Sequence, residues 1–142
     1  MAALAPSGPS PALACLGLVR GGSTDQREAA LASLAAMLSS EDASDEAIVQ
    51  VNELICSTAG CLEEVCGFLH ASSASASAKQ SALVVLANLV ADGGTDESSR
   101  RRVRLLGGFD RALALLGSTD PDLARCAAGA CMNFCRGIVE AS

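Results

Sequence analysis

Three of the seven cysteines fall within ten residues of one another, in the stretch CAAGACMNFC (Cys126–Cys135). Thiolates bind zinc and exchange disulfides, so a cluster of this kind can form a metal or redox site. On one helix, Cys131 and Cys135 share a face, whereas Cys126 lies off that face. No histidine is near, so the stretch lacks a full zinc ligand set and is interpreted as a packing segment.

The other residues that could do chemistry do not form a site either. Cys61 and Cys66 lie near the single histidine, His70, but without C-x-x-C spacing. Acid–base catalysis would depend on carboxylates, and these gather at expected helix starts, where capping and solvation explain them. An enzyme, a cofactor, a metal site and a small-molecule substrate are therefore not predicted, and a thiol or metal protein is the least favoured alternative.

The composition favours helices, so any functional site would have to be built on helices. Ala and Leu dominate together with Ser, and the first two are strong helix formers. Alternating runs of Val, Ile, Thr and aromatic residues, which are typical of strands, are not seen. We predict an all-α chain, and its 142 residues fit one domain.

The chain repeats itself at an interval of about 45 residues. Placing Asn88 over Asn133 (133 − 88 = 45) aligns SALVVLANL with CAAGACMNF, and Leu86 then matches Cys131. Upstream, GCLEEVCGFL from Gly60 is similar to GGFDRALALL from Gly107. A weaker copy near the N-terminus places Leu18-Val19 over Leu115-Leu116. It has Ala36 in the position of the Asn. Because it aligns with Leu86, Cys131 is interpreted as a small hydrophobic residue. An interval of about 45 residues is typical of helical repeats.

The stretch LLGGFDRALALLGSTDPDLARCAAGACMNF resembles an armadillo repeat, with its Gly-Gly, short Leu-Leu helix, Ser-x-Asp turn and Ala-rich helix carrying an Asn. The resemblance extends less closely over residues 45–91 and 12–38. It implies a right-handed α–α superhelix, a short armadillo-like solenoid of about two full repeats plus one partial repeat. The expected divisions are a disordered segment 1–11, a partial repeat 12–40, repeats 41–92 and 95–137, and a tail 138–142.

Local signals agree with these divisions. Gly107 can close one helix in the left-handed conformation, and Thr95 or Asp96 can cap another. Asp120 can cap the last helix, with Pro121 in its first turn. The segment HASSASASAK is expected to be a longer loop, which is mobile or offsets the helices it joins.

The resemblance also implies a site. The third helices of armadillo repeats line a concave groove, in which an Asn clamps the main chain of an extended peptide. Asn88 and Asn133 would take that role here; the alternative is that each Asn bonds a neighbouring loop carbonyl. Helical spacing adds Gln80, Val84, Arg125, Gly129 and Arg136 to the groove face, and Glu28, Ala32 and Ala36 in the partial repeat. A glycine within a helix suggests close approach by a ligand or a neighbouring helix.

These residues predict a non-enzymatic protein-interaction scaffold. Arg125 and Arg136, without an acid beside them, suggest an acidic or phosphorylated peptide. Val84 and Gly129 stand where import receptors carry Trp, so an import signal is not the predicted ligand. The alternative is an assembly element: neither end of the array has a polar cap, so we expect association through an end, by residues such as Phe134, or membership of a longer array.

Net charge and hydropathy limit the classes of partner and the cellular compartments that are expected for this chain. A net charge of −6 argues against nucleic acid, and RRRVR (Arg100–Arg104) is read as a solvated helix face. Acids concentrate in Glu41–Glu64 and arginines in Glu97–Arg136, which fits internal complementarity or partner recognition.

No run approaches the roughly 20 apolar residues that span a bilayer, and no secretory signal is evident. We predict a cytoplasmic protein with reduced thiols; the nucleus and an organelle transit peptide stay open.

Overall fold

The computed structural model describes residues 9–71, 74–91 and 95–141, and this part of the chain contains eight helices and no strands. The prediction of an all-α chain is confirmed. The helices are α1 (Pro9–Gly21), α2 (Thr24–Ser39), α3 (Asp45–Ser57), α4 (Cys61–His70), α5 (Ala76–Leu89), α6 (Glu97–Leu105), α7 (Gly108–Leu115) and α8 (Pro121–Ala141).

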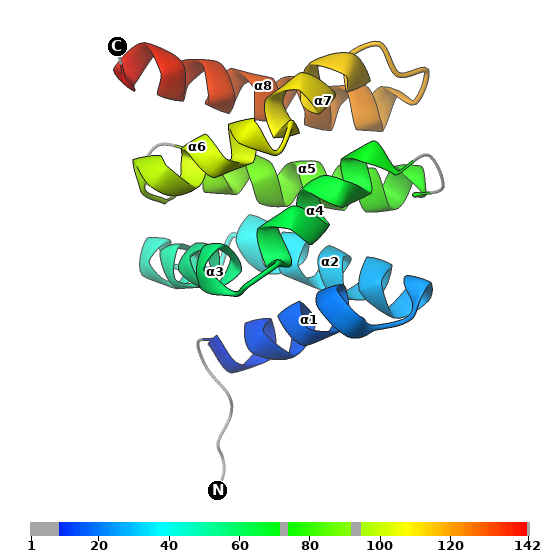
Figure 1. Cartoon of the computed structure of the whole chain (residues 1–142), viewed down its shortest axis with the longest axis vertical. Helices are drawn as coiled ribbons and strands as arrows, with labels where there is room; N and C mark the ends of the chain where they lie inside the picture. The colour runs from blue at the N-terminus through cyan, green and yellow to red at the C-terminus, as the bar shows by residue number, and fades with distance from the viewer. Residues whose placement is uncertain (1–8, 72–73, 92–94, 142) are drawn as a thin grey trace, which may run out of the picture.

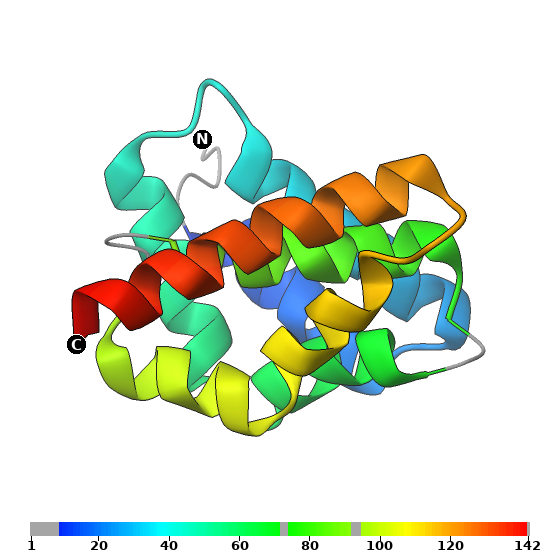
Figure 2. The same ribbon diagram turned by 90° about the horizontal axis from the view of Figure 1, so that it is seen from above.

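The helices form three tiers along the longest axis of the molecule (Figure 1). The first tier is α1 and α2, the second is α3 to α5, and the third is α6 to α8. Helices α2, α5 and α8 lie side by side in one layer, and α1, α4 and α7 lie side by side in another. Seen from above, α8 lies over α5, with α6 and α7 on the other side of the tier (Figure 2).

Two helix boundaries differ from the expected divisions. Helix α1 begins at Pro9, inside the segment 1–11 that was expected to be disordered, and residues 1–8 of that segment lie outside the described residues. Pro9 and Pro11 fit there because the first turn of a helix needs no backbone N–H donors. Helix α8 continues to Ala141, beyond the expected start of a tail at residue 138.

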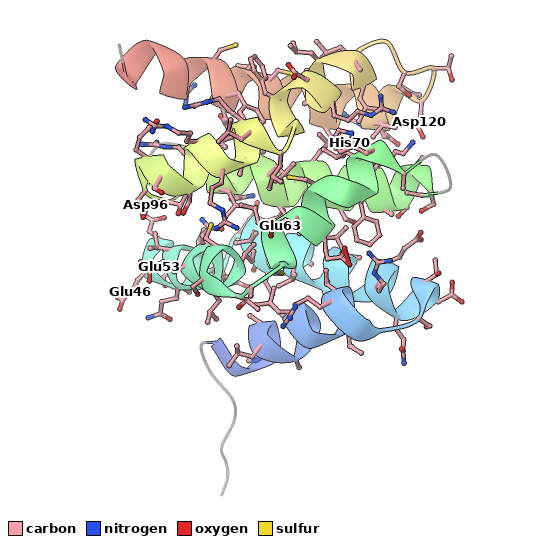
Figure 3. The ribbon with its side chains drawn as sticks, in the orientation of Figure 1. Glu46, Glu53, Glu63, His70, Asp96 and Asp120 are labelled. Carbon is pink, nitrogen blue, oxygen red and sulfur yellow. The ribbon has the colours of Figure 1, made fainter. Side chains whose placement is uncertain are left out.

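Side-chain caps set the starts of α6 and α8, as the sequence predicted. Asp96 accepts a hydrogen bond from the backbone N–H of Ser99 at the start of α6 (2.8 Å). Asp120 accepts one from the backbone of Leu123, and Pro121 opens α8. The two aspartates stand at opposite ends of the third tier (Figure 3). Each cap satisfies a donor that would otherwise lack a partner within the helix.

Glycines allow the sharp turns into α4 and α7. Gly60 and Gly107 have φ angles of +80° and +84°, and this left-handed conformation is accessible to glycine without steric cost. A Cβ atom on Gly107 would also lie 3.1 Å from the ring of His70. The Nε2 atom of His70, which is labelled in Figure 3, lies 3.2 Å from the carbonyl oxygen of Leu106, the residue that precedes Gly107. The loop predicted in HASSASASAK is short, since α4 ends at His70 and α5 begins at Ala76, and residues 72–73 lie outside the described residues.

Each helix of the third tier is joined to its counterpart in the second tier by one side-chain hydrogen bond. In each bond a side chain donates to a carbonyl in the last turn of the counterpart helix, where no intrahelical donor is provided. The bonds run from Arg102 Nη1 to the Cys56 carbonyl (3.0 Å), from Arg111 Nε to the Leu69 carbonyl (2.7 Å) and from Asn133 Nδ2 to the Ala87 carbonyl (2.9 Å). The paired residues are 46, 42 and 46 positions apart, close to the interval of the sequence repeat.

One hydrophobic core runs through all three tiers. Leu31, Leu86 and Phe134 are fully buried, one in each tier, and Phe134 stacks on Phe109 with ring centroids 5.0 Å apart. Cys131 is buried in the same core, as its alignment with Leu86 predicted.

Candidate functional site

A shallow depression of about 350 Å³ lies between α5 and α8. It is lined by Leu83, Val84, Ala87 and Asn88 from α5 and by Cys126, Gly129, Ala130, Met132 and Asn133 from α8. Four of the predicted groove residues, Val84, Asn88, Gly129 and Asn133, therefore come together there. Gln80, Arg125 and Arg136 do not line it.

The amide nitrogens of both asparagines are bonded to backbone carbonyls. Asn88 Nδ2 donates to the carbonyl of Val84, one turn earlier in its own helix, at 2.9 Å. Asn133 Nδ2 donates across the tiers to the carbonyl of Ala87. Among the described residues, neither amide oxygen has a hydrogen-bonding partner. Each side chain thus keeps its acceptor and one N–H for another group.

The acceptor of Asn133 is a carbonyl that the end of α5 leaves open. The backbone N–H that would ordinarily reach Ala87 belongs to Ala91, and it bonds the carbonyl of Asn88 instead (3.4 Å). Asn133 therefore satisfies one of the last carbonyls of α5. Of the two roles predicted for Asn133, this contact is the structural one, although its acceptor is a helix end rather than a loop.

Gly129 is exposed on α8, where it lines the depression. A Cβ atom built on Gly129 would meet nothing within 4 Å among the described residues. The suggestion that a neighbouring helix requires this glycine is therefore wrong. Glycine within a helix costs about 1 kcal/mol relative to alanine, and packing in the free protein does not explain that cost.

The rest of the predicted groove face is dispersed. Arg125 forms an ion pair with Asp122, one turn earlier, so the prediction that it has no acid beside it is wrong. Arg136 is exposed on α8, beyond the depression. In the first tier Glu28 accepts a hydrogen bond from the hydroxyl of Ser75 (3.0 Å), which caps α5. Ala32 and Ala36 are exposed on α2 and present only methyl groups.

The arginine-rich segment of α6 is engaged with carboxylates of the same chain. Glu97 pairs with Arg100 (3.4 Å) and with Arg104 (3.2 Å). Arg102 reaches Glu63 at the start of α4 (3.2 Å; Glu63 is labelled in Figure 3). This contact joins the arginine-rich and acid-rich segments, so at least part of their charge asymmetry is internal complementarity.

A second depression was not predicted from the sequence. It has a volume of about 380 Å³ and lies between the first tier and α3. Its lining includes apolar residues such as Met37, Ile48 and Val51, together with Asp42. The helical spacing of apolar residues in α3 is also what a buried face produces, so the sequence carried no separate signal for this depression. Its lining shows no convergence of amide groups, which distinguishes it from the depression between α5 and α8.

Cys61 and Cys66 of α4 behave as core residues. Burial raises the pKa of Cys61 to about 11 and that of Cys66 to about 12, so both thiols are protonated at neutral pH. A protonated thiol is a poor nucleophile and a poor metal ligand. Within the described ranges, no group of three or more His, Cys, Asp or Glu side chains is placed to hold a metal ion.

None of the helices in the described part of the chain combines the length and the apolar character needed to cross a bilayer. Comparisons with protein-family models, with curated protein sequences and with solved structures gave no match.

Proposed function

We propose that this chain is a non-enzymatic protein-binding scaffold, folded as a short armadillo-like, right-handed superhelix of about two full repeats and one partial repeat. Its ligand is an extended peptide that lies along the layer of α2, α5 and α8. The observation that supports this function is the depression between α5 and α8, which gathers Asn88, Asn133 and Gly129 on one surface.

The chemistry of the depression suits main-chain recognition. The amide oxygens of Asn88 and Asn133 can each accept a hydrogen bond from a peptide N–H, and each amide keeps one N–H for a peptide carbonyl. The open position above Gly129 lets a peptide backbone approach α8 closely. Apolar lining from Leu83 and Met132 offers a surface for one peptide side chain.

Ligand charge is a weaker part of the prediction. An acidic or phosphorylated peptide was expected because of two arginines, and Arg125 already has a carboxylate partner in Asp122. Only Arg136 still supports that preference. The proposed ligand is therefore defined by an extended main chain rather than by its charge.

Selection of a random peptide library against the full chain tests this function. The affinity of the selected peptides would be measured for the wild type, for Asn88→Ala and for Gly129→Leu, which fills the depression. Gly67→Leu is the matched control, because it adds the same side chain at another helical glycine whose Cβ position is open. We expect affinity to fall about tenfold or more for the first two variants and to stay unchanged for the control. Failure to select any binder, or equal affinity for Gly129→Leu, contradicts the proposal.

A second candidate function is an assembly element that docks through the end helices. Leu18 on α1, Leu113 on α7 and Leu116 at the C-cap of α7 support it, because these large apolar side chains are exposed. Helix α1 belongs to the first tier and α7 to the third (Figure 1). Phe134, the residue expected to mediate such docking, does not support it, because its ring is buried against Phe109.

A further inference from the structure

Helix α7 and its C-cap residue expose two leucines at positions that are buried in the tiers below. Leu113 and Leu116 are each 44% exposed. Aligning Gly60 with Gly107 places them over Cys66 and Leu69 of α4, which are 2% and 0% exposed. Helix α7 packs against α4 at this point, since Arg111 donates to the carbonyl of Leu69. The surface formed by Leu113 and Leu116 is therefore exposed to solvent, whereas the equivalent surface of α4 is buried where α7 packs.

The first tier repeats this pattern and supports the register. Aligning Leu18 with Leu115 places Leu16 and Val19 of α1 at the positions of Leu113 and Leu116. Both residues are buried, at 1% and 0% exposure, and α4 packs against α1. These positions are thus covered wherever another tier follows.

Helix α1 exposes the other half of the same contact. Arg111 and Leu115 lie one turn apart on the face of α7 that meets α4, and Leu115 is 9% exposed. Their counterparts on α1 are Ala14 and Leu18, and Leu18 is 41% exposed. Neither counterpart is charged, so covering this face requires no desolvation of a charge.

We propose that a second copy of this chain seats its α1 on α7, so that chains stack head to tail. The contact repeats the packing of α7 on α4 within one chain, and it does not depend on a peptide in the α5–α8 depression. Because the two surfaces differ, association is heterologous and extends with concentration rather than stopping at a symmetric dimer.

This contact should be weaker than its internal counterpart. Ala14 stands where Arg111 donates to a helix-end carbonyl, so the contact between copies lacks that hydrogen bond. The net charge of −6 on each chain also opposes association at low ionic strength. Salt screens this repulsion, so self-association should increase with salt concentration.

Sedimentation velocity of the full chain over a concentration series tests the proposal. We expect the weight-average mass of the wild type to rise with concentration, and to rise further in added salt. Two double variants at exposed positions, Leu113→Glu/Leu116→Glu and Ala14→Glu/Leu18→Glu, should each sediment as monomers. An equimolar mixture of the two should form a species of twice the chain mass and grow no further, because each variant keeps one intact surface.

Several outcomes overturn the proposal. One is a wild type that stays monomeric at its highest soluble concentration in added salt. Another is a mixture that stays monomeric although circular dichroism and unfolding midpoints show both variants folded. A third is association that only the α7 variant abolishes, because it indicates a symmetric contact between two α7 helices.

Discussion

The side-chain amide of Asn133 donates a hydrogen bond to the backbone carbonyl of Ala87, with 2.9 Å between nitrogen and oxygen. The donor belongs to α8 and the acceptor to the last turn of α5, so one polar side chain joins two tiers. Asn88, at the equivalent position of the second tier, makes its bond inside its own helix, to Val84. The two asparagines are aligned in sequence but differ in what they stabilise.

Replacing Asn133 by alanine should lower the free energy of unfolding by about 1 kcal/mol, because the carbonyl of Ala87 loses its side-chain donor. Asn88→Ala is the matched control. Its bond lies within one helix turn, and alanine is the better helix former, so stability should change by less than about 0.5 kcal/mol. Urea unfolding of both variants measures the difference. Equal losses would show that the bond between tiers contributes nothing of its own.

Gly129→Ala should raise the free energy of unfolding by about 1 kcal/mol, because the added methyl group meets no atom within 4 Å and alanine favours the helix. Gly67→Ala on α4 should behave in the same way. Gly108→Ala should destabilise, since its Cβ would lie 2.9 Å from Val103 Cγ1. Thermal and urea unfolding check the order of the three variants. A loss of stability in Gly129→Ala would mean that the space above Gly129 is filled in the free protein.

The thiols should differ widely in reactivity at mildly alkaline pH. Cys135 is exposed, whereas Cys61 and Cys66 are buried with pKa values raised to about 11 and about 12. Because the thiolate is the reacting form, Cys135 should be alkylated in the folded protein and the other two only after unfolding. Mass spectrometry of peptides after timed labelling, with and without urea, measures this. Labelling of Cys66 as fast as Cys135 without urea would contradict the packing of α4.

The ion pair between Glu63 and Arg102 should make a small, pH-dependent contribution to stability. A hydrogen bond from its own backbone N–H, and then the Arg102 guanidinium, hold the pKa of Glu63 below its ordinary value of 4.5. The stabilisation is therefore present above pH 4.5 and is lost as the pH falls through the lower folded value.

Glu63→Gln should therefore cost a few tenths of a kcal/mol at neutral pH, since the side chain is half exposed, and nothing at about pH 2. Urea midpoints at the two pH values measure this. Glu53→Gln is the control, because Glu53 is exposed on α3 and has no ion pair among the described residues. A Glu63→Gln deficit that persists in acid would assign the effect to packing instead.

Much of the fold could be predicted because its signals are local. Asp96, Asp120 and Gly107 act within one helix turn, so residue type and position were sufficient to place helix ends. The pair Arg125 and Asp122 was equally local and was overlooked, although a spacing of three residues on a helix brings such side chains together. Pro9 was placed in the segment expected to be disordered, but it begins α1, because the first turn of a helix accepts proline.

The candidate site was predictable only as a surface. Helical spacing placed Val84 and Asn88 on one face and Gly129 and Asn133 on another, and the repeat interval suggested that the faces adjoin. It could not decide whether the space above Gly129 was open or which carbonyl each amide would bond. Those properties depend on how α5 and α8 pack against each other.

The sequence alone thus determined the helices, their caps and their repeat interval, because each depends on neighbours along the chain. Tertiary structure alone decided that Asn133 bonds Ala87, that Arg102 bonds Cys56 and Glu63, and that Leu116 is exposed where Leu69 is buried. The physical reason is that hydrogen bonds and burial between tiers depend on how the tiers stack, and residues about 45 positions apart leave no local trace of that stacking.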